Sequence, residues 1–126
     1  MSLEEPVLTV QIETLGDLAV VECAGRIVRS QAVFELRDAV MSQAAARLIV
    51  RDLSEVAAIG GGGVGMLAFL QRWACDHDIR FKLYSPSNSV MDGLEHHSSI
   101  VSFEIATLHE MMILVAFADS QYPLAA

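Results

Sequence analysis

Five short stretches of the chain carry the apolar or alternating patterns of β-strands. Ile79–Tyr84 (IRFKLY) alternates cleanly, and Arg47–Leu53 (RLIVRDL) is rich in the β-branched residues of a central strand. The turn sequence Leu15-Gly16-Asp17 lies between the first two stretches and predicts a hairpin. The predicted strands are Val7–Glu13, Leu18–Ala24, Arg47–Leu53, Ile79–Tyr84 and Ser102–Ile105.

Between these strands, apolar residues recur at helical spacing. The spacing predicts a helix from Gln31 to about Met41, with Ser30 as N-cap, a second over Val64–His77, a third from Ser89 to His97, and a fourth from Thr107 to about Ala118. The order is β-β-α-β-α-β-α-β-α, which predicts right-handed crossovers in a mainly parallel sheet, made mixed by the opening hairpin. We expect one α/β domain over residues 1–126, in which residues 1–5 are flexible or partly tag-derived.

Composition and charge narrow the choice of partners. The chain has 126 residues, of which 53% are hydrophobic and 19% charged, so we expect a packed core. The formal charge is −8 and the basic residues are scattered singly, which argues against nucleic acid and anionic membranes. The longest apolar run, Met111–Ala118, is far shorter than the roughly 20 residues of a membrane-spanning helix. The start of the sequence has no secretion signal, so we expect a cytoplasmic protein with Cys23 and Cys75 as buried, reduced thiols.

The glycine run in AIGGGGVGML is the first candidate for chemistry. Gly60, Gly62 and Gly65 fit the G-x-G-x-x-G spacing of a dinucleotide-binding turn. However, the predicted strand ends about six residues earlier, and no acidic residue follows the next strand, where Tyr84-Ser85-Pro86 stands. A Walker-type loop is excluded because Met66 occupies the lysine position. Two weaker readings stay open: backbone amides that hold an anion, or a mobile loop.

Four segments in this order resemble a STAS domain, the family of anti-sigma-factor antagonists and of the cytosolic domains of sulphate transporters. They are Gly25-Arg26-Ile27 at a strand end, Asp52-Leu53-Ser54, the glycine-bearing turn, and Ser85-Pro86. The resemblance covers nearly the whole chain, and the order of elements is also that of the family. It implies a protein-interaction module with no catalytic residue and no cofactor.

The glycine turn departs from the family pattern. Family members read roughly Asp-Ser-Ser-Gly-Leu-Gly where this chain has Gly60-Gly61-Gly62-Gly63-Val64-Gly65. By resemblance, Gly61 occupies the position of the serine that a partner kinase phosphorylates, Gly60 replaces the acid before it, and Val28 replaces another acid. Glycine has no hydroxyl to accept a phosphoryl group, so the resemblance implies a binding module that is not switched off at this position.

The implied partner is an anti-sigma factor or a related serine kinase, in bacterial transcription or stress regulation. The alternatives are a self-associating scaffold subunit and a small anion- or lipid-binding domain. The predicted partner-binding residues are Val28, Arg29, Ser30, Gly60, Gly61, Gly62, Gly63, Val64 and Met66.

The last predicted helix, LHEMMILVAFAD, is apolar on all sides between Glu110 and Asp119. Either the domain covers it on two sides, or one side contacts another chain, for example in a homodimer. The candidate contact residues are Met111, Met112, Val115 and Phe117. No metal site is expected, because the four histidines lack the spacing of metal ligands.

Overall fold

The computed structural model describes residues 7–97 and 103–121, with side chains up to residue 117. The segment expected to be flexible or tag-derived, residues 1–5, lies outside the described residues. Five strands form one sheet in the order β1-β2-β3-β4-β5, in which β1 and β2 are antiparallel and the other neighbouring pairs are parallel. The strands are β1 (Leu8–Leu15), β2 (Leu18–Ile27), β3 (Leu48–Ile59), β4 (Arg80–Tyr84) and β5 (Glu104–Ala106).

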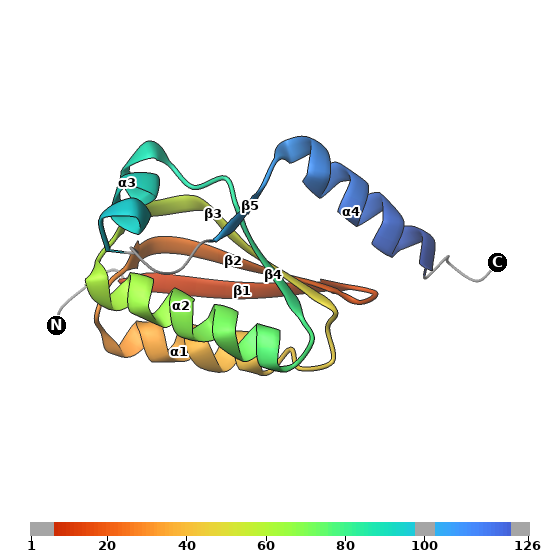
Figure 1. Ribbon diagram of the computed structural model, residues 1–126, viewed down its shortest axis with the longest axis horizontal. Helices are drawn as coiled ribbons and strands as arrows, with labels where there is room; N and C mark the ends of the chain where they lie inside the picture. Colours follow the sequence, from red (N-terminus) through yellow and green to blue (C-terminus); the bar gives the residue numbers. More distant parts are fainter. Residues whose placement is uncertain (1–6, 98–102, 122–126) are drawn as a thin grey trace, which may run out of the picture.

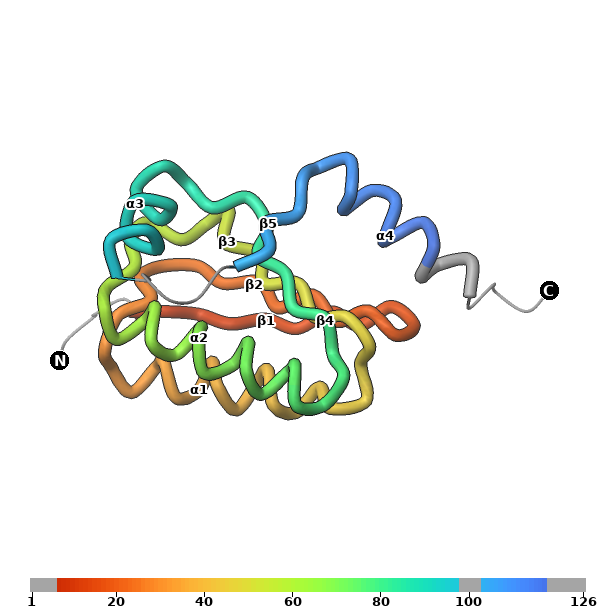
Figure 2. The backbone as a smooth tube through the Cα atoms, in the orientation of Figure 1, coloured from red at the N-terminus to blue at the C-terminus, as the bar shows by residue number. Residues whose placement is uncertain are grey.

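The helices divide between the two faces of this sheet. Figure 1 shows α1 and α2 side by side along one face and α3 at the end of β3, whereas α4 packs over the opposite face near the β1–β2 hairpin. The tube in Figure 2 shows the same arrangement of the helices around the sheet. None of the helices within residues 7–97 and 103–121 has the length and apolar character needed to cross a membrane. The helices are α1 (Gln31–Met41), α2 (Gly61–Asp76), α3 (Asn88–His97) and α4 (Leu108–Gln121).

Successive side chains of the central strands point to opposite faces of the sheet, and each face carries its own cluster of buried apolar residues. The larger cluster lies under α1 and α2, where Val21 and Ile49 of the sheet meet Leu36 and Leu70 of the helices. A smaller cluster lies under α4 on the opposite face. Its buried members are Leu18, Val50, Ala106 and Met111.

The predicted order of elements is confirmed, but two boundaries at the glycine run and one thiol differ from the predictions. The strand β3 does not end near Leu53: it continues to Ile59, past a register shift opposite Glu22 and Ala24. The helix α2 begins at Gly61, so three of the four glycines are helical rather than a loop before the helix. Cys75 is exposed, whereas Cys23 is buried as expected, and both thiols are free.

The helix caps also differ in part from the predictions. Ser30 occupies the N-cap position of α1, but its hydroxyl donates to the carbonyl of Val28 at 3.0 Å and makes no capping bond. The helix α3 begins at Asn88, one residue before the predicted Ser89, and is capped by Ser87, whose hydroxyl accepts a hydrogen bond from the Val90 amide at 3.2 Å. Thr107, where the last helix was predicted to begin, caps α4, since its hydroxyl accepts a hydrogen bond from the Glu110 amide at 3.1 Å.

Candidate partner-binding site at the glycine turn

The end of β2 and the start of α2 meet at the glycine turn. The Gly60 amide donates to the Ile27 carbonyl at 3.0 Å, which joins the last residue of β2 to the residue before α2. A methyl group added at Gly60 would stand 3.5 Å from Cγ1 of Val28, an ordinary contact. The β2–α1 connection therefore lies directly beside the first turn of α2.

Close backbone approach explains the glycines at two positions. Gly63 is buried, and a Cβ there would overlap the carbonyl group of Ile27, so any side chain would force the strand and the helix apart. At Gly62 a Cβ would stand 2.8 Å from Cβ of Arg29, so a side chain would require that residue to shift. Gly63 thus has a packing role, which is independent of any ligand.

Gly61 is different, because it is exposed and has room for a side chain. Its nearest neighbour would be Nδ1 of His97, 3.4 Å from an added Cβ. His97 is the last residue of α3, and the sequence had indicated no role for it beyond its exclusion as a metal ligand. Its position beside Gly61 follows from the packing of α3 against α2, which leaves no signal in the local sequence.

The structure brings the nine predicted partner-binding residues into one region but does not expose all of them. Arg29, Gly61 and Gly62 are exposed. Val28, Ser30, Gly60 and Met66 are partly buried. Gly63 and Val64 are buried, so neither offers a side chain to a partner, and the prediction was wrong to count them as contact residues.

The groups at this edge are cationic or neutral. The first amides of a helix carry partial positive charge, and the exposed Arg29 and His97 stand beside them. No carboxylate occurs in residues 28–30 or 60–66, although the chain as a whole carries a charge of −8. We name the surface formed by Val28, Arg29, Gly60, Gly61, Gly62 and His97 the glycine-turn surface.

The extended β3 also changes one argument against a dinucleotide site. The glycines follow the strand directly, so the expected six-residue gap does not exist. The other objection stands, since Tyr84-Ser85-Pro86 supplies no acid after β4 to bind a ribose. Within the described part of the chain, no three potential metal-ligating side chains lie together.

The sequence matches no protein-family model and no curated protein, whereas the fold matches solved structures. An anti-sigma factor antagonist from Mycobacterium paratuberculosis has a TM-score of 0.71 at 21% identity, over 90% of this chain and 99% of that chain. The anti-sigma factor antagonist SpoIIAA in its unphosphorylated form has a TM-score of 0.70 at 19% identity, over 86% of this chain and 97% of that chain. The chain has the fold of the anti-sigma factor antagonists.

The STAS fold is not restricted to these small proteins. The murine anion transporter solute carrier 26 family member A9 has a TM-score of 0.68 at 12% identity, over 83% of this chain but only 18% of the transporter. The predicted STAS-like architecture is therefore confirmed. Identities at this level establish the fold alone, so the role of the glycine-turn surface has to be argued from its own residues.

Proposed function

We propose that this protein is a non-enzymatic, cytoplasmic interaction module of the anti-sigma-factor-antagonist type. Its partner is an anti-sigma factor or a related serine kinase, and it binds through the glycine-turn surface. The observation that carries the proposal is the exposed backbone of Gly61 and Gly62, set between Arg29 and His97. Such a surface offers shape, amide groups and positive charge, but no hydroxyl group at the glycines.

The same surface supports constitutive binding. The solved structures with this fold include SpoIIAA in a phosphorylated and an unphosphorylated form. Here the position that by resemblance carries the phosphorylated serine is Gly61, which has no hydroxyl. A phosphate would add about −1.5 to −2 charges and could break an interface by repulsion and desolvation. Without an acceptor, the complex persists in the presence of ATP.

Affinity capture from the native cytosol, with and without ATP, tests this function. The full chain serves as bait, the retained proteins are identified by mass spectrometry, and the recovered bait is weighed. We expect a kinase-like protein or an anti-sigma factor to be retained in both conditions, with the bait unmodified. Release of the partner by ATP together with a phosphorylated bait would contradict the proposal.

A further inference from the structure

The large exposed apolar side chains are concentrated at one end of the molecule. Of the eight in the described part of the chain, six lie on β5 and α4, and the other two are Phe34 of α1 and Phe69 of α2. A cluster of this kind on a soluble protein marks a contact surface. The six are Ile105, Leu108, Met112, Ile113, Val115 and Phe117.

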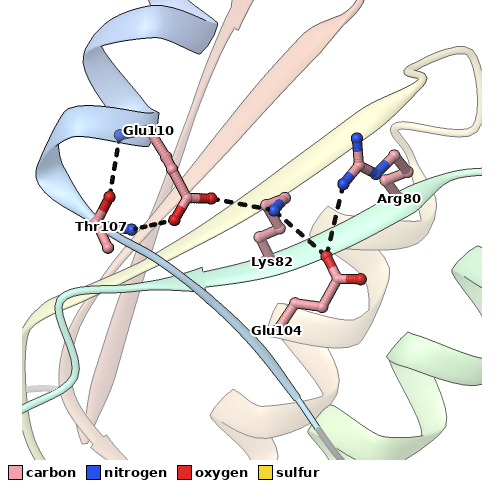
Figure 3. A network of polar contacts seen from close by, with 5 residues as sticks. All are labelled: Arg80, Lys82, Glu104, Thr107 and Glu110. Atoms are coloured by element: carbon pink, nitrogen blue, oxygen red, sulfur yellow. Dashed lines mark hydrogen bonds and ion pairs between the residues drawn. The ribbon is translucent and has the colours of Figure 1, made fainter.

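The helix α4 is firmly attached by one side only. Thr107 and Glu110 form a reciprocal capping box, in which each backbone amide donates to the side chain of the other residue. Figure 3 shows how Glu110 continues to Lys82, whose ammonium lies 3.4 Å from Glu110 Oε2 and 3.3 Å from Glu104 Oε2. Met111 is buried against the sheet, so it is not the exposed contact residue that the sequence predicted.

The attachment leaves an apolar groove beside the helix. The groove has a volume of about 540 Å³ and lies between the β1–β2 hairpin, the end of β4, and α4. Leu108, Met112 and Val115 line the groove and are themselves 63%, 62% and 41% exposed. One helix thus supplies both a wall of the groove and a projecting apolar ridge. A surface with both features is self-complementary, as a two-fold symmetric interface requires.

Charge and area point to a second copy of this chain as the occupant. Between Leu108 and Phe117 the ionisable side chains are His109 and Glu110, and Glu110 is engaged by Lys82. Two chains of charge −8 can therefore meet here without bringing like charges together, whereas an anionic membrane would repel the chain. A standard interface buries roughly 800 Å² per partner. The five large apolar side chains of α4 that are between 41% and 63% exposed supply apolar surface for such an interface.

We propose that the protein forms a two-fold symmetric homodimer in which α4 of each copy lies antiparallel in the groove of the other. Leu108, Met112 and Val115 lie at the centre of the interface. The α4 surface is separate from the glycine-turn surface. A failure of the dimer proposal would therefore leave the proposed partner-binding function untouched, and the reverse is also true.

Molar mass in solution tests the dimer. Light scattering on the full chain should give twice the single-chain mass of 13.7 kDa at high micromolar concentration. Met112→Glu should give the mass of one chain with an unchanged circular dichroism spectrum, because it places a charge in the apolar groove. Phe34→Glu is the matched control, since Phe34 is also exposed but lies on α1, and this variant should stay dimeric. A single-chain mass at every concentration, or a dimer that survives Met112→Glu, would overturn the proposal.

Crosslinking provides an independent test if Met112→Glu fails to fold. In a Cys75→Ser background, which removes the exposed thiol, Met112→Cys should form a disulfide-linked dimer on mild oxidation, and Phe34→Cys should not. Native mass spectrometry tests whether a ligand, such as a lipid, fills the groove beside α4 instead of a second copy of the chain. Two results would contradict the proposed homodimer. One is a single chain that carries a bound lipid, and the other is equal crosslinking of Met112→Cys and Phe34→Cys.

Discussion

The guanidinium group of Arg51 donates a hydrogen bond from Nη2 to Sγ of Cys23, 2.8 Å away, inside the main core. Arg51 lies on β3 between Val21 and Leu83 of the neighbouring strands and is completely buried. Within the described residues, neither Nε nor Nη1 of Arg51 has a hydrogen-bond partner. A buried charge with so few partners is expensive, because the loss of hydration is only partly offset.

Replacing Arg51 by an apolar side chain of similar length should therefore stabilise the protein. We expect Arg51→Met to raise the free energy of unfolding in urea by about 1–3 kcal/mol, because the charge is removed while the volume is kept. Cys23→Ala should lower it by about 2–4 kcal/mol, since it removes the acceptor and leaves the guanidinium alone. If Arg51→Met lowered the free energy of unfolding as much as Arg51→Ala does, the expectation would be wrong. The native protein would then compensate the charge of Arg51 where it lies.

The alternating pattern predicted much of the fold, but some of its details depend on tertiary contacts. Exposed Ser54, Glu55 and Ala57 interrupt the apolar pattern, so β3 was predicted to end at Leu53 instead of Ile59. Glycine is a poor helix former, so α2 was predicted to start three residues late.

The candidate site was located by the sequence only in outline. The β2–α1 and α2 segments of the site were predicted from the resemblance. The packing of α3 places His97 beside Gly61, which the sequence did not indicate. The burial of Arg51 could not be predicted either, because arginine is almost never fully buried. On α4 the sequence showed an excess of apolar residues but not which of them the sheet covers.

Two glycines near the start of α2 should respond oppositely to substitution by alanine. Gly63→Ala should lower the free energy of unfolding by about 1–3 kcal/mol, because the new methyl group overlaps the Ile27 carbonyl. Gly65→Ala is the matched control: it has open space around it in the same helix, and should raise stability by about 0.5–1 kcal/mol. Equal effects in urea denaturation would mean that the strand and the helix are not held at the distance described.

The attachment of α4 should depend on pH through Glu110. The Thr107 amide, and then the Lys82 ammonium, hold the pKa of Glu110 below its ordinary value of 4.5. A lowered carboxyl pKa stabilises the fold above the unfolded value, and this contribution disappears as the pH falls through the folded value. Glu110→Gln should therefore be less stable than the wild type at pH 7, with the difference vanishing in acid below pH 4.5.

Urea denaturation of both proteins across this range measures the effect. Added salt should reduce the difference at pH 7, because Glu110 is 43% exposed and its attraction to Lys82 is screened. A difference that is constant with pH would contradict a stabilising role for the charge of Glu110, whether through the Thr107 amide or through Lys82.

Restoring the acid and the hydroxyl at the glycine turn should create a kinase substrate. Gly60 has the extended backbone of an N-cap, and both Gly60 and Gly61 have room for a side chain. Gly60→Asp with Gly61→Ser should therefore fold at least as stably as the wild type, with a gain of a few tenths of a kcal/mol from the cap. Incubated with ATP and a kinase partner, the variant should gain the mass of one phosphate, and the wild type should not. A stable complex that leaves the variant unmodified would contradict the assignment of Gly61.

The affinity of the captured partner for two charge-reversal variants tests the role of the glycine-turn surface most directly. Arg29 stands beside Gly62, whereas Arg72 is exposed near the other end of α2 and serves as the matched control. Titration calorimetry should show that Arg29→Glu weakens binding by at least about tenfold, or roughly 1.4 kcal/mol, while Arg72→Glu leaves it unchanged. Equal affinities for Arg29→Glu and the wild type, or a loss confined to Arg72→Glu, would place the partner elsewhere on the molecule.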